Sequence, residues 1–209
     1  MYQDVFIIGT TGNVGRTLVK QIIEKDMDCE KHVNPTRIIG VASSTQNLFL
    51  KNGLTKEGWF NFSKDSKRYN SLDELLIKAN SIKKGNKIIT FIDVTSSKDI
   101  VDFHLKVIRK TDFGIVTANK NPLTLSDYKT FQELIKEPDR YGYRCSVMAG
   151  AGVIDYIQDL RDVGDLPTSI EGCFSGTNGF ILSELEKGKK FSKTLKEAVE
   201  RGYNQYLRN

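Results

Sequence analysis

Two apolar segments of this chain each run directly into a polar segment, and this pattern limits the folds that the chain can adopt. Ile88–Ile92 precedes Asp93–Ser97, and Gly114–Val116 precedes Thr117–Pro122, with one helical repeat between them. Short apolar runs that alternate with helices are typical of buried parallel strands. Open α/β sheets bind ligands at the carboxyl ends of such strands, so we expect both polar segments to border one crevice.

The N-terminus supplies a third segment of this kind. Val5–Ile8 is a continuous apolar run, and a glycine-rich loop and an amphipathic helix follow it. This order is the context that a dinucleotide motif needs, because glycines let the backbone approach a pyrophosphate and the helix start offers N–H groups. A tight turn without a ligand is the alternative. The loop residues that we expect at a cofactor are Gly9, Thr10, Thr11, Gly12, Asn13, Val14 and Gly15.

The end of the second predicted strand, Arg37–Ala42, bears on the choice of cofactor. An acidic residue near this position binds the ribose hydroxyls in NAD-specific enzymes. This chain has Ser43–Thr45 there instead. Hydroxyl groups and a nearby cation favour the 2′-phosphate of NADP, with NAD as the alternative. We therefore expect Ser43 among the cofactor contacts and Arg16 or Lys51 as the cation.

The polar segments after the later strands supply further candidate contacts. Thr95, Ser96 and Ser97 can line the cofactor, and Ser96 or Ser97 can also cap the next helix. Asn119 and Lys120 follow the next strand, where the nicotinamide is expected. An ordinary surface charge is the alternative for Lys120. We assign all five residues to the expected cofactor site.

The remaining pattern predicts two domains. Residues 1–152 are expected to form a Rossmann-type, doubly wound parallel sheet, and residues 153–209 the start of an α+β substrate and dimerisation domain. Residues 46–69 show little periodicity, so we expect a surface excursion there. The other predicted elements are a helix opened by a capping box at Ser71–Glu74, a helix over Leu125–Ile135, a strand over Tyr143–Val147, a strand of a second sheet over Ser169–Ser175, and helices that begin near Ile154, Phe180 and Ser192.

Composition argues against several classes of protein. The chain has 209 residues, a net charge of +5 and a pI near 9.0, but its lysines are spread over helix faces and loops, so we expect no nucleic-acid partner. No apolar run approaches the roughly 18 residues that span a bilayer, and no signal peptide precedes the first strand. We expect a cytoplasmic protein without a membrane partner.

The cysteines and histidines suggest neither a disulfide framework nor a transition-metal site. Cys29, Cys145 and Cys173 are odd in number and far apart, which is typical of a reducing compartment, and the last two fall in strand-like runs expected in the core. His32 and His104 are distant from each other, and no cluster has metal-ligand spacing. We expect His104 to be a residue of a helix face.

Several short segments together match the order and spacing of one known family. They are the N-terminal glycine loop, Gly40–Ala42, Asp93–Ser97, Thr117–Lys120, Gly150–Gly152, Glu171–Thr177 and Glu200–Tyr203. In these segments the chain resembles homoserine dehydrogenase, and the similarity covers nearly the whole sequence.

The resemblance implies an activity and a set of site residues. It implies the reversible, NAD(P)-dependent reduction of aspartate 4-semialdehyde to L-homoserine, a step of threonine and methionine biosynthesis, by a homodimer. Lys120 would lie near the nicotinamide and the substrate oxygen as the catalytic residue. Gly176 would contact the cofactor and, with Thr177 and Tyr203, form the homoserine pocket. A sodium ion would be bound by the carbonyls around Ala149, Ala151 and Val153.

The chain also departs from the family pattern. The first glycine of the loop is one residue further from the second, Ser146 stands in place of the acidic residue of the sodium site, and Ile154 stands in place of a proline. Asn204–Asn209 replaces the segment that leads to the family's substrate-binding Asp and proton-transferring Lys. We therefore expect this chain to bind dinucleotide and to turn over poorly.

Two alternatives belong to other classes. The first is a catalytically silent dinucleotide-binding relative that serves as a sensor or partner subunit. The second is a different semialdehyde dehydrogenase, which would need a catalytic cysteine, and Cys145 has no histidine near it in the sequence.

Overall fold

The computed structural model of the protein describes residues 3–26, 35–83 and 89–203. The chain forms two compact units that divide after Tyr143, and each is described by itself. The boundary that we expect after residue 152 stays a prediction. Within the described residues, no helix has the length and apolarity that crossing a bilayer requires. Cys29 and His32 lie outside the described residues.

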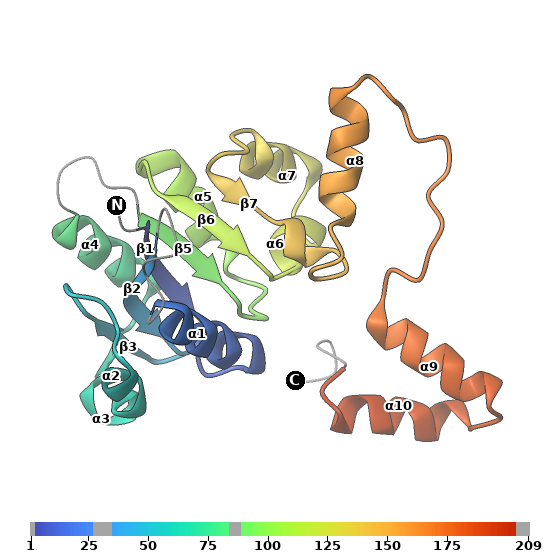
Figure 1. Ribbon diagram of the computed structural model, residues 1–209, viewed down its shortest axis with the longest axis horizontal. Coiled ribbons are helices and arrows are strands. Elements are labelled where there is room, and N and C mark those ends of the chain that lie inside the picture. The colour runs from blue at the N-terminus through green and yellow to red at the C-terminus, as the bar shows by residue number, and fades with distance from the viewer. Residues whose placement is uncertain (1–2, 27–34, 84–88, 204–209) are drawn as a thin grey trace. The chain divides into compact units, whose positions relative to one another are not determined.

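The first unit is built on a sheet that contains seven strands within the described residues (Figure 1). They are β1 (Gln3–Ile8), β2 (Thr36–Ala42), β3 (Gln46–Phe49), β4 (Lys67–Arg68), β5 (Ile89–Asp93), β6 (Gly114–Thr117) and β7 (Tyr141–Gly142). The order is β4-β3-β2-β1-β5-β6-β7. The five strands from β2 to β7 in this order are parallel, whereas β3 and β4 run antiparallel at one edge. The predicted α/β fold with a mostly parallel sheet is confirmed.

Helices cover both faces of this sheet. They are α1 (Asn13–Asp26), α2 (Lys56–Phe60), α3 (Phe62–Asp65), α4 (Leu72–Ile82), α5 (Val101–Lys110), α6 (Asn121–Thr124) and α7 (Tyr128–Ile135). Val5 and Ile7 of β1 pack in one apolar cluster with Val19 of α1, while Phe6 and Ile8 pack in another that includes residues of α4, α5 and α7. Alternate residues of β1 are thus buried on opposite faces, which explains why its sequence is continuously apolar.

The segment 46–69 corrects our expectation of a surface excursion. It contains β3 and β4, which extend the sheet, and the short helices α2 and α3. Leu48 of β3 and Phe62 of α3 contribute to the apolar cluster on the α1 face. The short length of these elements hides their periodicity in the sequence, and tertiary pairing decides their structure.

Two helix starts also differ from our predictions. The Ser71 side chain makes no capping hydrogen bond to α4; instead the Glu74 carboxylate accepts hydrogen bonds from the backbone and side chain of Asn70. The helix predicted from Leu125 begins at Tyr128, because the Asp127 side chain caps it by accepting a 2.7 Å hydrogen bond from the Thr130 N–H.

The strand predicted over Tyr143–Val147 is wrong. The strand at this point is β7, which pairs with β6 only at Tyr141 and Gly142. A short 3₁₀ helix, η2 (Arg144–Ser146), follows. Cys145 is exposed there, so it is not the core residue that we expected.

The described residues of the second unit form helices and loops. The helices after η2 are α8 (Val153–Asp162), α9 (Gly176–Glu186) and α10 (Phe191–Glu200). The strand predicted over Ser169–Ser175 is wrong, since this segment pairs with no described strand, and Cys173 is exposed. An unpaired segment has no partner for its backbone hydrogen bonds and is not stable as a strand.

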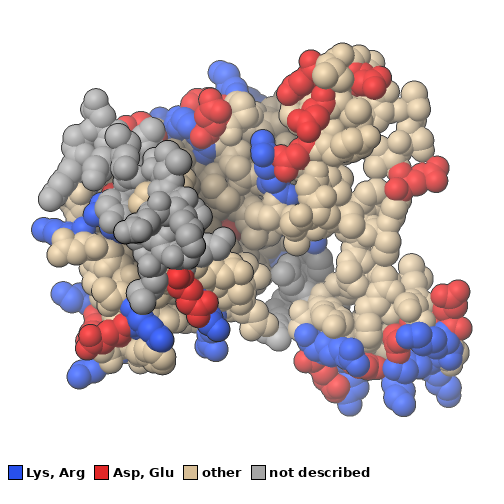
Figure 2. Space-filling model, in the orientation of Figure 1, with Lys and Arg blue, Asp and Glu red and all other residues tan. Residues whose placement is uncertain are grey.

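Ion pairs join α9 to α10. The Lys189 ammonium contacts the carboxylates of Glu184 and Glu197, and Lys187 contacts Glu184 as well. The hydrogen bonds from Lys187 and Lys189 lower the pKa of Glu184 to about 2. Figure 2 shows the basic side chains of these helices among acidic ones.

Candidate functional site

The strand order of the first unit reverses between β1 and β5. The chain leaves β1 toward β2 on one side and returns to β5 on the other, so the segments after β1 and β5 leave the same edge of the sheet next to each other. Ligands of open α/β sheets bind at such a switch point. A cleft of about 750 Å³ opens here. It is lined by Ile8, Gly9, Thr11, Gly12, Ser43, Ser44, Tyr69, Asn70, Ser71, Leu72, Val94, Thr95, Ser96, Ser97, Asp99 and Ile100.

The glycine loop between β1 and α1 has a backbone that larger residues could not adopt. Gly9 has φ +93°, and a Cβ there would lie 3.0 Å from the backbone nitrogen of Thr95. A Cβ at Gly15 would lie 2.3 Å from the carbonyl oxygen of Gly9. The N–H groups of Gly9 and Thr10 and the Thr10 hydroxyl all donate to the Ala42 carbonyl at the end of β2. The loop is therefore held against the sheet while α1 begins directly beside it.

The start of α1 can bind an anion. The helix begins at Asn13, and the first N–H groups of any helix lack partners within the helix. Thr11, Gly12, Asn13 and Val14 are exposed, so the backbone of the loop is accessible from solvent. Accessible N–H groups at the positive end of a helix favour a phosphate group.

Asp93, at the end of β5, ties the two polar segments together. One carboxylate oxygen accepts a 2.9 Å hydrogen bond from the Thr95 N–H, and the other accepts a 3.0 Å bond from the Thr117 hydroxyl. Burial raises the pKa of Asp93, but its interactions with His104 and Thr95 lower it, and the net pKa lies below the ordinary value. Asp93 therefore remains a carboxylate at neutral pH.

Asn119 and Asn121 bind the other segment directly. The Asn119 amide donates to the Ser97 carbonyl at 2.8 Å and to the Thr95 hydroxyl at 3.3 Å, and the Asn121 amide donates to the Ser96 carbonyl at 3.0 Å. These contacts place the two polar segments side by side at one edge of the sheet. Only Asp93–Ser97 contributes to the lining of the cleft, so a crevice bordered by both segments stays a prediction.

The structure separates the expected contacts into accessible and buried residues. Asn119 is buried, and both of its amide hydrogens are used, so its side chain connects the segments. Lys120 is exposed, and its ammonium forms no hydrogen bond or ion pair with the described part of the chain. Ser96 and Ser97 are exposed at the cleft. The helix after them begins only at Val101, so neither serine caps it as we predicted.

The hydroxyl of Ser43 takes part in a local turn. Its oxygen accepts a 3.1 Å hydrogen bond from the Gln46 N–H, and the residue is buried. Ser44 is exposed and lines the cleft. Of the hydroxyls at the end of β2, that of Ser44 is therefore the more available to a ligand.

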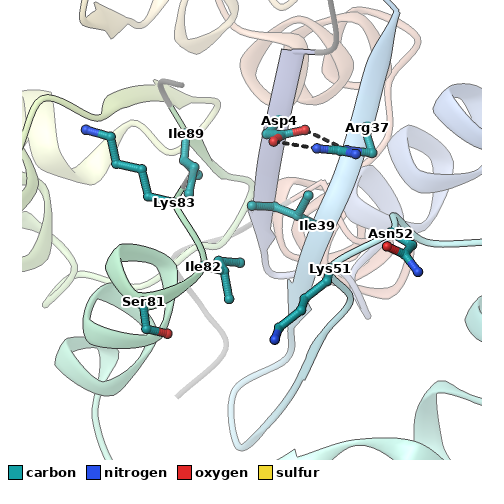
Figure 3. Close-up of a pocket in the computed structure, with 9 residues that line it drawn as sticks. All are labelled: Asp4, Arg37, Ile39, Lys51, Asn52, Ser81, Ile82, Lys83 and Ile89. Atoms are coloured by element: carbon teal, nitrogen blue, oxygen red, sulfur yellow. Dashed lines mark hydrogen bonds and ion pairs between the residues drawn. The ribbon is translucent and has the colours of Figure 1, made fainter. Parts of the chain in front are cut away.

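Lys51 is not near this cleft, which corrects our expectation that it binds a phosphate there. It lines a separate cavity of about 260 Å³ with Asp4, Arg37 and Ile89, at the opposite ends of the strands (Figure 3). Arg37 donates to both oxygens of Asp4 in this cavity. Because β3 runs antiparallel to β2, the chain after β3 returns to the edge where β2 begins. Arg16 of α1 is exposed and lines a third cavity together with Thr11 of the loop.

In the second unit, three of the expected residues lie together. Gly176 and Thr177 begin α9, and the Thr177 hydroxyl donates to the backbone carbonyl of Tyr203. The Tyr203 ring contacts the Phe180 ring edge-on, at a centroid distance of 5.2 Å. This arrangement holds the backbone after α10 against the start of α9.

The expected sodium loop precedes α8. Met148 and Ala149 have φ values of 53° and 51°, and Gly152 has φ 68°. Left-handed conformations at non-glycine residues are uncommon and turn the backbone sharply. No group of three His, Cys, Asp or Glu side chains that could hold a metal occurs among the residues described. The expected donors, Ala149, Ala151 and Val153, would supply only neutral carbonyl oxygens.

The geometry of the first unit defines a class of protein. A parallel sheet covered on both faces, with a glycine-rich loop and a helix start at the switch point of its strand order, is a Rossmann-type nucleotide-binding domain.

Sequence comparison identifies the family within this class. A sequence model of the family described as homoserine dehydrogenase matches residues 153–206. The chain is 30% identical over 208 residues to the bifunctional aspartokinase/homoserine dehydrogenase of Haemophilus influenzae. The aligned region covers 97% of this chain and 25% of that protein. It is 29% identical over 216 residues to the homoserine dehydrogenase of Schizosaccharomyces pombe, with 97% and 55% covered. The chain belongs to the homoserine dehydrogenase family and spans only part of the length of these relatives.

Solved structures share the fold. A hyperthermophilic archaeal homoserine dehydrogenase in complex with NADPH has a TM-score of 0.72 and 21% identity, and the match covers 99% of this chain and 63% of that one. A Candida auris protein of unknown function has a TM-score of 0.74 and 24% identity, with 97% and 56% covered.

Proposed function

We propose that this chain binds NADP(H) in the cleft at the β1–β5 switch point and is the cofactor-binding part of an enzyme that interconverts L-homoserine and L-aspartate 4-semialdehyde. The observation that carries the proposal is the convergence of the glycine loop, Thr95–Ser97 and Thr117–Lys120 at one sheet edge. Membership of the homoserine dehydrogenase family supports the reaction, and the NADPH complex of an archaeal relative supports the class of cofactor.

The residues of the cleft suit a dinucleotide. Gly9 and Gly15 remove side chains that would separate the loop from its neighbours, and Gly12 leaves the loop open toward the ligand. The N–H groups at the start of α1 supply donors for a pyrophosphate. The absence of an acidic residue at Ser43–Thr45 and the exposed hydroxyl of Ser44 favour NADP over NAD. Arg16, which lines a cavity with Thr11 of the loop, is the cation that we assign to the 2′-phosphate.

Lys120 is the residue that we assign to the reaction. A bound nicotinamide supplies the hydride chemistry, while the protein orients and polarises the reacting groups. Lys120 follows the end of β6, its ammonium is exposed, and its neighbour Asn119 is fixed by hydrogen bonds. A fixed backbone with a free cation can attract the substrate oxygen and stabilise negative charge on it.

The second unit supplies the remaining parts of the proposal. We assign Gly176 to both cofactor and substrate, and Thr177 and Tyr203 to the homoserine pocket. The hydrogen bond between Thr177 and Tyr203 supports this grouping. We assign the carbonyls of Ala149, Ala151 and Val153 to a sodium ion, because an uncharged set of hard oxygen donors suits a monovalent cation. Homodimer formation and a cytoplasmic location remain predictions.

Binding and turnover test different parts of the proposal. Titration of the chain with NADPH and NADH, followed by nucleotide fluorescence, should show saturable binding and a lower Kd for NADPH. At least tenfold tighter binding of NADH would overturn the cofactor preference, and the absence of binding to either would overturn the proposed site.

Homoserine-dependent formation of NADPH should then be measured for this chain and for a product of the whole reading frame. We expect turnover by the longer product if its sequence supplies an Asp and a Lys for substrate binding and proton transfer. A longer product that binds NADPH without turnover would instead identify a silent relative.

A further inference from the structure

A buried histidine, His104, lies directly behind Asp93, the residue that connects the loops after β5 and β6. His104 belongs to α5 and is 0% exposed, because the helix face that carries it packs on the sheet. Its Nδ1 lies 2.9 Å from the hydroxyl of Tyr141 in β7, and its Nε2 lies 3.3 Å from one carboxylate oxygen of Asp93. The sequence places His104 on a helix face, but only the fold brings it to Asp93 and Tyr141.

The surroundings determine where the imidazole carries its proton. Burial and the nearby charge of Asp93 raise the pKa of Tyr141, so Tyr141 keeps its hydroxyl hydrogen. The pKa of Asp93 is lowered, so Asp93 accepts hydrogens and donates none. The ring therefore directs an Nε2–H toward Asp93, with the Tyr141 hydroxyl at its other nitrogen. The 3.3 Å separation is long for a hydrogen bond, and the attraction to the carboxylate is mainly electrostatic.

The orientation of Asp93 matters because each of its oxygens serves a different loop. Oδ1 accepts from the Thr95 N–H, and Oδ2 accepts from the Thr117 hydroxyl and faces His104. The Thr117 hydroxyl in turn accepts from the Asn119 N–H. A rotation of the carboxylate would therefore disturb the loops after both β5 and β6.

We propose that His104 is a positioning residue, which holds the Asp93 carboxylate so that the loops Thr95–Ser97 and Thr117–Lys120 keep the spacing that dinucleotide binding requires. This inference rests on the proposed function of the cleft. Tyr141 holds the imidazole from the opposite side. His104 itself does not line the cleft, so any effect on binding passes through Asp93.

Three variants test the role in binding. His104→Leu fills the site with an apolar side chain and removes the Nε2–H. We expect the Kd for NADPH to rise about tenfold or more, because the buried Asp93 carboxylate loses a polar partner. His104→Gln can still donate toward Asp93, and we expect it to restore binding to within about threefold of the wild type. Val107→Ala, one turn along the same buried helix face, should lower the free energy of unfolding and leave the Kd unchanged.

The Kd values are to be compared under conditions in which urea titration has shown that each variant is fully folded. Equal NADPH affinity of His104→Leu and the wild type would overturn the inference, as would equal losses in His104→Leu and His104→Gln. If His104→Leu does not fold, Tyr141→Phe replaces it, since it removes one hydroxyl only and should still weaken binding. Wild-type affinity in folded Tyr141→Phe would then count against the inference.

The proton position can be read independently of binding. The chain contains two histidines, so ¹⁵N-labelled His32→Gln protein reports His104 alone. Long-range ¹H–¹⁵N correlation spectra should show a proton on Nε2, and a ring protonated at Nδ1 alone would overturn the proposed arrangement. Failure of the wild type to bind NADPH would instead refute the function of the cleft, so the two failures are distinguishable.

Discussion

Replacement of Gly15 by alanine tests whether the glycine loop depends on close backbone packing. The new Cβ would lie 2.3 Å from the Gly9 carbonyl oxygen and 2.6 Å from the Thr10 Cα. Ordinary contacts begin near 3.4 Å, so the helix start must move by about 1 Å, and the obstructing atoms belong to the backbone. A side chain cannot simply rotate to relieve this overlap.

The magnitude follows from two opposing effects. Overpacking typically costs about 1–3 kcal/mol, and a severe overlap with backbone atoms belongs in the upper part of that range, at about 2–3 kcal/mol. Alanine in place of glycine inside a helix contributes up to about 1 kcal/mol in the other direction. We therefore expect Gly15→Ala to lower the free energy of unfolding by about 1–2 kcal/mol, which corresponds to a Tm lower by roughly 2–8 °C for a chain of this size.

Gly12→Ala is the matched control in the same loop. A Cβ there would lie 3.5 Å from the Gly9 carbonyl oxygen, an ordinary contact, and Gly12 faces the cleft. Its free energy of unfolding should stay within about 0.5 kcal/mol of the wild type, while NADPH binding weakens because the methyl group occupies the side of the loop that meets the ligand. Urea titration followed by circular dichroism measures both stabilities. Equal stability of Gly15→Ala and Gly12→Ala would refute the packing argument.

Three further predictions concern charge and capping. Lys120→Gln should raise the Kd for NADPH about tenfold, whereas Lys129→Gln on the exposed side of α7 should not; equal Kd values by fluorescence titration would remove Lys120 from the site. Arg140 donates to the carbonyls of residues 107, 108, 111 and 113, so Arg140→Gln should cost about 1–3 kcal/mol in urea unfolding, and an unchanged midpoint would contradict this. Because the fold lowers the pKa of Asp93, its negative charge stabilises the folded state above the unfolded pKa of 3.8, and this contribution is lost as the pH falls through the folded pKa. Asp93→Asn should therefore lose less stability between about pH 5 and pH 2 than the wild type. Parallel pH profiles of the free energy of unfolding would refute the prediction.

Local patterns in the sequence were sufficient for the parallel sheet and its ligand edge. Val5–Ile8 is apolar at every position, and that pattern requires burial on both faces. Polar residues directly after β5 and β6 then have to meet at one edge, because parallel strands end together. The contacts of Asn119 and Asn121 with residues 95–97 follow from this geometry.

Tertiary structure alone decided the elements whose pattern is short and the residues that meet through the core. The segment Ser169–Ser175 has a strand-like sequence, but a strand exists only where a neighbour supplies hydrogen bonds. Lys51 lies at the opposite edge of the sheet from the β1–β5 cleft, because β3 runs antiparallel to β2 and reverses the chain direction. His104 lies beside Asp93 because α5 packs on the face of the sheet that includes Phe91 of β5. A sequence contains no local record of contacts between residues that are distant along the chain.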